Sequence, residues 1–236
     1  MKSKIEHLGI IMDGNRRWAK ARRLLSFEGH RAGYNKIEEV LNWCNDAEIK
    51  ILTLFVFSTE NWKRPKKEVD FLMKILYFAF TKDIKRLHKH NVCVRAIGRK
   101  EEMPEKIKKA IIKAEALTKN NTASVLNLAI NYGGRSELVD AFNKILSARS
   151  GSALGEKNSP KKITEDLISN NIYTAGLPNP DLIIRTSGEC RLSGFLTWQS
   201  AYSEFYFTKH HWPEFSKKDF DGALADFTSR QRRFGK

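Results

Sequence analysis

The sequence predicts an α/β fold: one domain over residues 1–236 in which helices flank a mostly parallel central sheet. Short apolar runs alternate along the chain with segments of helix length, which is the pattern of a doubly wound sheet. The runs are rich in β-branched and aromatic residues, as buried parallel strands are. With 236 residues, of which 41% are hydrophobic, and no internal repeat, the chain can fill one such core.

Five apolar runs are the expected strands, and they cover residues 8–12, 49–57, 92–97, 124–130 and 182–184. The expected helices lie between and after them, at residues 30–46, 67–90, 104–118, 135–148, 161–170 and 217–228. The stretch 147–162 mixes Ser, Gly, Pro and Lys, so we expect an exposed loop there rather than a linker between domains.

The chain is strongly basic, because 42 Lys and Arg residues against 27 Asp and Glu residues give a net charge of +15. Such a charge favours a phosphate-bearing partner, which can be nucleic acid, an anionic membrane or a phosphorylated small molecule. The basic residues are spread along the sequence without a recognisable nucleic-acid-binding module, which argues against nucleic acid.

Cysteine usage and the N-terminal region indicate a cytoplasmic protein. Cys44, Cys93 and Cys190 are odd in number and far apart, so neither a disulfide framework nor a cysteine-rich zinc site is expected. The apolar stretch 8–12 is too short for the core of a signal peptide or for a membrane span.

Polar clusters follow four of the expected strands. They are Asp13-Gly14-Asn15, Ser58-Thr59-Glu60-Asn61, Asn131-Tyr132-Gly133-Gly134 and Arg185-Thr186-Ser187-Gly188. Ligands of open parallel sheets bind beyond the carboxyl ends of the strands, so these clusters would meet in one crevice. Strands of any α/β protein end in polar turns, which accounts for part of these residues but leaves the neighbouring arginines unexplained.

The residues after the first strand fit a site for a metal and a phosphate. Asp13 can hold Mg²⁺, while the Gly-Asn turn, Arg16 and Arg17 bind phosphate oxygens. A helix expected to begin near "EGHRAG" places His30 beside its positive end as a second phosphate contact. Further forked donors are Arg64, Arg185 and Arg191. The alternative for each single arginine is a solvated surface charge.

The helix expected at residues 67–90 is apolar on two sides. The first stripe has ordinary core spacing and comprises Val69, Leu72, Met73, Leu76 and Phe80. The second comprises Phe71, Ile75 and Phe78, and it fits a plain core helix, a tunnel for a hydrocarbon ligand, or a subunit interface.

Nucleotide motifs such as GxxxxGK[ST] and GxGxxG are absent from the sequence. These features predict an amphiphilic substrate with a diphosphate head and a hydrocarbon tail.

Five segments stand out as motifs: "HLGIIMDGNRRWAK", "GHRAG", "FSTENWKRP", "PDLIIRTSGECRLSGFLTWQSAYSEFYF" and "RQRRFG", in this order between residues 7 and 235. Together they resemble the cis-prenyltransferase family, most closely its bacterial undecaprenyl-diphosphate synthases. The resemblance implies a Mg²⁺-dependent enzyme that adds isopentenyl diphosphate units to an allylic diphosphate such as farnesyl diphosphate, each with a cis double bond. The product would be a polyprenyl diphosphate such as undecaprenyl diphosphate, a lipid-carrier precursor for cell-wall synthesis.

The resemblance also implies roles for individual residues. Asp13 would be the central catalytic acid and a metal ligand, and Glu204 would be a second metal ligand. Asn61 matches the position of a proton acceptor, but an amide is a very weak base, so it would orient a proton transfer to a diphosphate oxygen. Substrate contacts are implied for Gly14, Asn15, Arg16, Arg17, Trp18, Ser26, His30, Ser58, Thr59, Glu60, Trp62, Arg64, Arg185, Arg191, Leu192 and Ser193. Within this set, Arg185, Arg191 and Ser193 match the site for isopentenyl diphosphate.

Three positions depart from the family pattern. Ser26 stands where many relatives have an arginine, so one expected diphosphate contact is weakened, and Arg22 or Arg23 would have to replace it. Cys190 stands where relatives often have His or Gln, so no metal role is carried over to it. Gly194 replaces a frequent Asn.

The resemblance further implies a homodimer whose basic C-terminal tail reaches the partner's site, and a peripheral contact with the inner face of the membrane for product release. The alternative function is that of a non-catalytic subunit that binds lipid or an active partner within a prenyltransferase complex. Retention of Asp13, Asn61, Arg185, Arg191 and Glu204 argues against that alternative.

Overall fold

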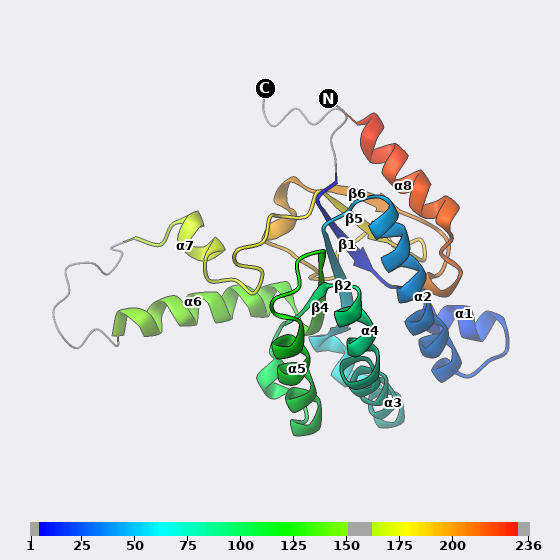
Figure 1. Ribbon diagram of the computed structural model, residues 1–236, viewed down its shortest axis with the longest axis horizontal. Helices are drawn as coiled ribbons and strands as arrows, with labels where there is room; N and C mark the ends of the chain where they lie inside the picture. The colour runs from blue at the N-terminus through cyan, green and yellow to red at the C-terminus, as the bar shows by residue number, and fades with distance from the viewer. Residues whose placement is uncertain (1–4, 151–161, 231–236) are drawn as a thin grey trace.

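Six strands form one parallel sheet in the computed structural model, which describes residues 5–150 and 162–230 (Figure 1). The strands are β1 (His7–Ile11), β2 (Ile51–Ser58), β3 (Val92–Ile97), β4 (Ser124–Tyr132), β5 (Leu182–Arg185) and β6 (Glu204–Phe207). Their order across the sheet is β3-β4-β2-β1-β5-β6, and every neighbouring pair is parallel. The predicted α/β class with a parallel central sheet is confirmed.

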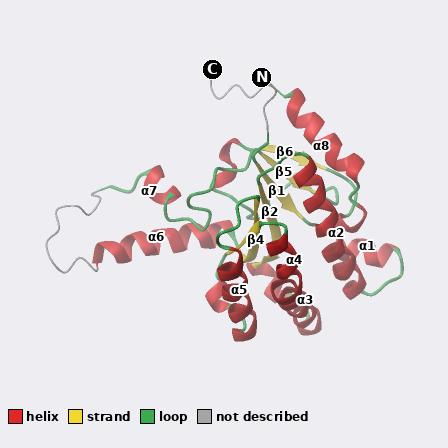
Figure 2. Ribbon diagram, in the orientation of Figure 1, coloured by secondary structure: helices red, strands yellow, loops and turns green. Residues whose placement is uncertain are grey.

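Helices flank this sheet (Figure 2). The α-helices of the described residues are α1 (Asn15–Ala21), α2 (Ser26–Asp46), α3 (Lys66–Phe78), α4 (Ile84–Lys89), α5 (Glu105–Thr118), α6 (Gly134–Ser150), α7 (Glu165–Ser169) and α8 (Lys217–Ser229). Short 3₁₀ segments are η1 (Thr59–Lys63), η3 (Lys100–Glu102), η4 (Gln199–Tyr202) and η5 (Trp212–Glu214), and η2 (Ala79–Asp83) is a π-helical turn.

The structure differs from the sequence prediction mainly at short elements. It adds α1 and β6, which are too short and too polar or exposed to give an apolar run of their own. Helix α2 begins at Ser26 rather than at residue 30, because Glu28 Oε2 accepts the backbone N–H of Leu25 at 2.9 Å and closes the start of the helix. Helix α6 continues to Ser150, so only residues 147–150 and 162 of the expected loop 147–162 are described.

The long helix expected at residues 67–90 is interrupted. It consists of α3, the π-helical turn η2 and α4. Within the turn, Thr81 Oγ1 donates a hydrogen bond to the Tyr77 carbonyl at 2.6 Å, and such back-bonding bends helices.

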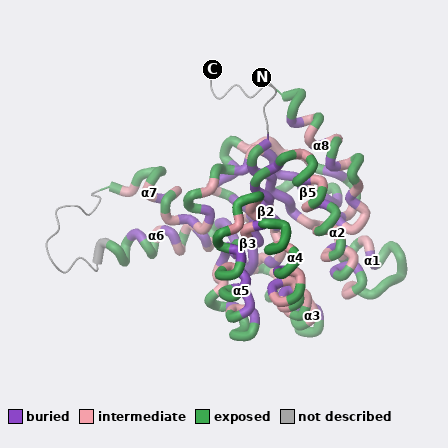
Figure 3. The backbone as a smooth tube through the Cα atoms, viewed as in Figure 1, coloured by how far each residue is buried: buried purple, intermediate pink, exposed green. Residues whose placement is uncertain are grey.

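The core against the sheet has two parts, one on each face, and a separate small cluster lies at α6 and α7. Buried residues, purple in Figure 3, follow the strands. Leu8 and Ile10 of β1 belong to the larger part, which α2, α3, α5 and α8 cover. Ile11 faces the other side and packs with Phe195 and Leu196, which precede β6. Both faces of β1 are therefore covered, as expected for a central parallel strand. Among the described residues, no helix combines the length and the apolar character needed to cross a membrane.

Candidate active site

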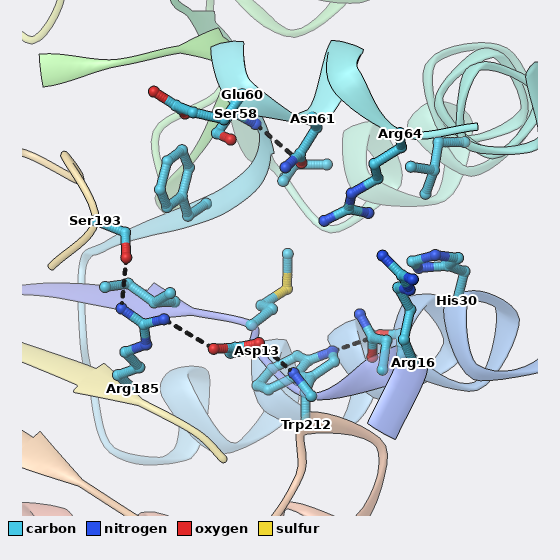
Figure 4. A pocket seen from close by; sticks show the side chains of 18 of the residues that line it. Asp13, Arg16, His30, Ser58, Glu60, Asn61, Arg64, Arg185, Ser193 and Trp212 are labelled. Atoms are coloured by element: carbon cyan, nitrogen blue, oxygen red, sulfur yellow. Dashed lines mark hydrogen bonds and ion pairs between the residues drawn. The ribbon is translucent and has the colours of Figure 1, made fainter. Parts of the chain in front are cut away.

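A cavity of about 1370 Å³ lies at the carboxyl ends of β1, β2 and β5, next to the loop after β4 (Figure 4). The structure thus brings the polar clusters that follow these strands to one place. The predicted site residues that line the cavity are Asp13, Gly14, Asn15, Arg16, Arg17, Ser26, His30, Ser58, Thr59, Glu60, Asn61, Arg64, Arg185 and Ser193. Those outside the lining are Trp18, Trp62, Arg191, Leu192 and Glu204.

The Asp13 carboxylate lies at the wall of the cavity among donors. Its Oδ2 accepts a hydrogen bond from Arg185 Nη2 at 2.8 Å, and Arg17 Nη2 lies 3.2 Å from the same oxygen. Its Oδ1 accepts the backbone N–H of Gly14 at 2.7 Å. Partial burial by itself would raise the pKa of Asp13, but the hydrogen bond and charge of Arg185, the charge of Arg17 and the Gly14 N–H lower it below its ordinary value. Asp13 is therefore held as an anion facing the cavity.

The main chain at Asp13 is fixed by the segments after β5 and β6. Thr186 Oγ1 accepts the Asp13 N–H at 3.0 Å and donates to the Asp13 carbonyl at 2.7 Å. Trp212 N–H donates to the same carbonyl at 2.9 Å. Gly14 has a φ of +99°, and a Cβ there would lie only 2.6 Å from Ser187 Oγ, so a side chain has no room. These contacts leave the carboxylate little freedom to turn away from the cavity.

A second acid-centred cluster, the Glu68 cluster, consists of Glu68, Arg16, His30 and Arg64. Glu68 lies in the first turn of α3, and its side chain is only 6% exposed. Its Oε1 lies 3.0 Å from His30 Nε2 and accepts from Arg64 Nη1 at 3.2 Å, and its Oε2 lies 3.8 Å from Arg16 Nε. His30, Arg64 and Arg16 line the cavity, so the buried acid holds three basic side chains along one wall (Figure 4).

His30 is a neutral member of the Glu68 cluster near pH 7. Burial lowers the pKa of His30, Glu68 raises it, and the charges of Arg64 and Arg16 lower it again, with a net value below the ordinary one. An anion in the cavity would favour the protonated ring, because the added negative charge offsets the two arginines.

Asn61 lies in η1, where it shapes the loop after β2. Its Oδ1 accepts the backbone N–H of Ser58 at 3.2 Å, which leaves the side-chain amide at the cavity wall. Trp62 points elsewhere: its indole N–H donates to Asn131 Oδ1 at 2.8 Å, and its ring meets the edge of Phe57. Trp62 therefore packs the loop against Phe57 and Asn131 and does not line the cavity.

Arg185 connects Asp13 with the loop after β5. Its Nη1 donates to the carbonyl of Arg191 and to Ser193 Oγ, the latter at 2.8 Å. Its Nε is buried and has no hydrogen-bond partner among the described residues. The side chain of Arg191 is 60% exposed and pairs with Glu189 at 2.5 Å, and Glu189 also pairs with Arg17. Leu192 packs into the smaller part of the core.

Glu204 lies away from Asp13. It begins β6 in register with Leu182, and Leu182 is in register with Leu8 near the start of β1. Asp13 comes five residues later, which is roughly 16 Å along a strand. Glu204 Oε2 accepts a hydrogen bond from Arg230 at 2.6 Å. One chain alone therefore does not bring Asp13 and Glu204 together, and the metal role of Glu204 stays a prediction.

The apolar wall of the cavity differs from the predicted stripe of α3. Ile75 lines the cavity, but its neighbour there is Leu72, which belongs to the other stripe. Phe71 packs on Phe27 with ring centroids 5.1 Å apart, and Phe78 is half exposed beside Tyr34. Two members of the predicted stripe thus have other contacts, because the interruption and tilt of a helix cannot be read from spacing alone.

Several residues of the site are absent from the sequence prediction. Arg135 and Ser136 line the cavity directly after the Gly-Gly pair that follows β4, so the strand-end argument could have found them. Lys20, which is likewise absent from the sequence prediction, lines it too. Arg23, one of the two predicted replacements for an arginine at position 26, lines the cavity as well, while Arg22 turns away to stack on Trp18 and to pair with Glu214. Of the two candidates for the missing arginine at Ser26, the structure brings Arg23 to the cavity.

The residues around Asp13 fit a Mg²⁺ ion held jointly with a diphosphate. Among the described residues, no three His, Cys, Asp or Glu side chains are grouped into an all-protein metal site. Mg²⁺ is often bound by one or two carboxylates, substrate phosphates and water. Asp13 suits this arrangement because its carboxylate is ionised, 28% exposed and open to a cavity lined by phosphate-binding side chains.

Known proteins with similar sequences and structures share one family. The sequence matches the family described as "Putative undecaprenyl diphosphate synthase" over residues 11–235. It is 46% identical over 230 residues to an isoprenyl transferase of Clostridium tetani, with 98% of this chain and 89% of the relative covered. It is 48% identical over 235 residues to an isoprenyl transferase of Streptococcus pyogenes, with 98% and 93% covered.

Two solved structures are similar to this chain along nearly its whole length. Lavandulyl diphosphate synthase from Lavandula x intermedia, in complex with dimethylallyl diphosphate, superposes with a TM-score of 0.92 at 38% identity over 99% of each chain. A probable undecaprenyl diphosphate synthase from Campylobacter jejuni superposes with a TM-score of 0.80 at 32% identity over 99% of this chain and 100% of the other.

Proposed function

This chain belongs to the undecaprenyl diphosphate synthase family of cis-prenyltransferases, and we propose that it condenses isopentenyl diphosphate units onto farnesyl diphosphate with cis double bonds. It is an isoprenyl transferase, and the substrates of its family are isopentenyl diphosphate and an allylic diphosphate. The proposed product is a polyprenyl diphosphate such as undecaprenyl diphosphate, a precursor of the lipid carrier of cell-wall synthesis.

The observation that carries this proposal is a cavity with two chemically different walls. The basic wall comprises Asp13, Arg185 and the basic side chains of the Glu68 cluster, and the apolar wall includes Leu72 and Ile75, which follow Glu68 along α3. The basic wall suits a diphosphate, because arginine offers forked hydrogen bonds to phosphate oxygens. The apolar wall suits a hydrocarbon chain. An allylic diphosphate has both parts, and the relative from Lavandula x intermedia was solved with dimethylallyl diphosphate bound.

The basic side chains would act mainly as the allylic carbon–oxygen bond breaks. Negative charge then builds on the departing diphosphate, and Arg16 and Arg64 are already positioned to stabilise it. His30 would join them as the bound anion favours its protonated form. When Mg²⁺ is bound, Asp13 and diphosphate oxygens would hold it, and it would neutralise part of this charge. Asn61 would orient isopentenyl diphosphate at the loop after β2, so that the proton lost from isopentenyl diphosphate moves toward a diphosphate oxygen.

The loop after β5 would hold the second substrate. Arg185 fixes this loop through Ser193 Oγ and the Arg191 carbonyl, and it touches Asp13 with its other nitrogen. A diphosphate bound at Ser193 and Arg191 would therefore lie next to the allylic site, which is the alignment a bimolecular condensation needs.

Assembly and location are part of the proposal. We propose a homodimer that works in the cytoplasm, peripheral to the inner face of the membrane. The basic tail expected to reach the partner's site includes "RQRRFG", most of which lies outside the described residues.

Product analysis tests the proposal. Purified protein is incubated with farnesyl diphosphate, labelled isopentenyl diphosphate and Mg²⁺, and the products are separated by chain length. We expect long cis-polyprenyl diphosphates from the wild type and a shifted length distribution from Ile75→Ala, because Ile75 lines the apolar wall. Phe78→Ala is the matched control on the same helix, since Phe78 lies outside the lining. Absence of any condensation product would refute the proposed activity, and equal distributions for both variants would refute the assignment of the wall.

A further inference from the structure

The turn between α1 and α2 lies at the edge of the molecule (Figure 1), and it carries two exposed leucines. Leu24 is 38% exposed and Leu25 is 67% exposed. Of the large hydrophobic residues that the structure describes, only Tyr202 is more exposed than Leu25. Apolar side chains in this position add nothing to the core.

Local structure gives no reason for a leucine at position 25. Leu25 is the N-cap residue of α2, where Ser, Thr, Asp and Asn are favoured because their side chains accept a backbone N–H of the first turn. The leucine side chain cannot accept this bond. The hydrogen bonds at the cap instead run from the Leu25 N–H to Glu28 Oε2 at 2.9 Å and from the Glu28 N–H to the Leu25 carbonyl at 3.0 Å. Neither packing nor capping accounts for Leu25, so its side chain is available for a contact outside the folded chain.

Positive charge exceeds negative charge around the two leucines, where the neighbouring acid is Glu28, which accepts the Leu25 N–H. Arg17 and Arg22 pair with acids of the chain, but Lys20 and Arg23 have no ion-pair partner within the described residues. Lys20, Arg23 and Leu24 also line the cavity, so the turn forms part of its rim. The rim therefore combines exposed apolar groups with free cations.

We propose that this turn docks on the surface of an anionic lipid bilayer, with Leu25 inserted below the headgroups and Lys20 and Arg23 among them. Clustered cations and a few apolar side chains bind such a surface together. Two leucines are too few for a stable protein interface, which needs about 800 Å² per partner. The inference rests on the proposed function, because a polyprenyl product would pass from the cavity rim to the bilayer without crossing water.

Vesicle binding tests the proposal with the full-length protein. Co-sedimentation is measured with vesicles of phosphatidylcholine alone and of phosphatidylcholine mixed with phosphatidylglycerol, at low and high salt. We expect binding to the anionic vesicles only, weakened by salt. Leu25→Ser should weaken it about tenfold, because most of one leucine side chain is no longer buried in the bilayer. Leu117→Ser, at an exposed leucine of α5, is the matched control and should leave binding unchanged.

Two further measurements distinguish docking by the turn from a loss of stability and from headgroup binding in the cavity. Leu25→Ser should unfold at the same or a higher temperature than the wild type, because serine is a better N-cap than leucine. Saturating inorganic diphosphate fills the cavity, which Lys20 and Arg23 also line, so it should weaken vesicle binding of the wild type and of Leu25→Ser alike. The tenfold difference between the two proteins should persist in diphosphate, because Leu25 lies outside the cavity lining. Disappearance of that difference would mean that the cavity captures lipid headgroups, and this result would overturn the proposal.

The remaining outcomes are equally decisive. The proposal would be overturned if Leu25→Ser bound the vesicles as well as the wild type does. It would also be overturned if Leu117→Ser lost as much binding as Leu25→Ser. Binding of RNA without binding of vesicles would mark the turn as a nucleic-acid contact instead. Condensation activity is measured in detergent on the same samples, where Leu25→Ser should match the wild type. An inactive protein that still binds vesicles through Leu25 would refute the proposed function and leave the docking surface standing.

Discussion

Two acid-centred clusters face the same cavity, and they arrange their charges in opposite ways. At Asp13 the acid stands at the cavity wall with its side chain 28% exposed, and the side chain of Arg185, which holds it, is only 5% exposed. At Glu68 the acid is buried at 6% exposure, and Arg16 and Arg64 stand between it and the cavity. The same residue types thus present an anion at one point of the cavity and cations at another.

This difference separates two kinds of phosphate chemistry. An exposed carboxylate can share a metal ion with a diphosphate, whereas a buried carboxylate surrounded by basic groups has no free oxygen for one. Glu68 instead fixes the orientation of the side chains that bind the anion directly, and it lowers the repulsion among them while the cavity is empty. We therefore expect changes at Asp13 to alter Mg²⁺ dependence and changes at Glu68 to alter substrate affinity.

Replacement of the exposed acid should have the largest effect. Asp13→Asn keeps the size of the side chain but removes its charge, so kcat/KM should fall about 1000-fold and the response to Mg²⁺ should flatten. Steady-state kinetics over a Mg²⁺ titration measure both. Asp140→Asn is the control, because Asp140 pairs with Arg99 outside the cavity lining. Near-normal turnover of Asp13→Asn would show that both clusters serve binding only.

Removal of the buried acid should act on affinity and on stability. Glu68→Ala leaves Arg64 and His30 without their shared partner, which should lower the free energy of unfolding by about 3 kcal/mol. Glu68→Gln retains a hydrogen bond to one of them and should lower it less. In both variants we expect KM for farnesyl diphosphate to rise about tenfold, with the Mg²⁺ response unchanged.

Urea unfolding and initial rates over a series of farnesyl diphosphate concentrations measure these effects. Glu115→Gln, which breaks a surface pair with Lys100, is the control. A changed Mg²⁺ requirement in Glu68→Gln would contradict the division of roles between the two clusters.

The sequence predicts the first cluster far better than the second. Asp13 comes after β1 and Arg185 ends β5, and the carboxyl ends of the strands of a parallel sheet converge by topology. Glu68 belongs to a helix that is distant in sequence from His30 and Arg16, and its burial depends on how α3 packs against α2. No spacing rule in the sequence reports that packing.

The same limit applies to the fold. Long apolar runs and amphipathic segments give the strands and most helices, because hydrophobic periodicity is a local signal. The edge strand β6 and the short helix α1 have little such signal and are stabilised by neighbouring elements. Helix α1, for example, packs so closely on α2 that a Cβ at Gly29 would lie 2.1 Å from the Asn15 carbonyl. The choice of Leu72 over Phe71 for the cavity wall likewise depends on tertiary packing.

The loop held by Arg185 offers a smaller test that concerns one substrate. Arg191 is exposed, so a bond from it to isopentenyl diphosphate should contribute about 1.5 kcal/mol, or about tenfold in affinity. We expect Arg191→Ala to weaken the binding of isopentenyl diphosphate by that factor and the binding of farnesyl diphosphate much less. Equilibrium binding of each substrate measures the two constants, with Arg95→Ala on β3 as a surface control. Equal losses for both substrates would mean that the two clusters and this loop form one shared site.

The smallest expected effect is a pH dependence that separates His30 from His7. Burial lowers the pKa of both rings below the ordinary 6.5, so the unfolded chain takes up their protons first as the pH falls. The free energy of unfolding should therefore decrease below about pH 6.5, by at most about 1.4 kcal/mol per pH unit for each ring. His30→Asn should remove one of these contributions, which urea unfolding over a pH series measures.

Inorganic diphosphate should distinguish the two rings. His30 lines the cavity, whereas His7 is bonded to Thr53 Oγ1 and to the Pro178 carbonyl, outside the cavity lining. A bound anion favours protonated His30, so its folded pKa rises toward the unfolded value and its share of the pH dependence shrinks. In saturating diphosphate the wild type should therefore approach the slope of His30→Asn, while the contribution of His7 persists in both proteins. A wild-type slope that diphosphate leaves unchanged would show that His30 does not sense the anion, and the Glu68 cluster would then bind it through Arg16 and Arg64 alone.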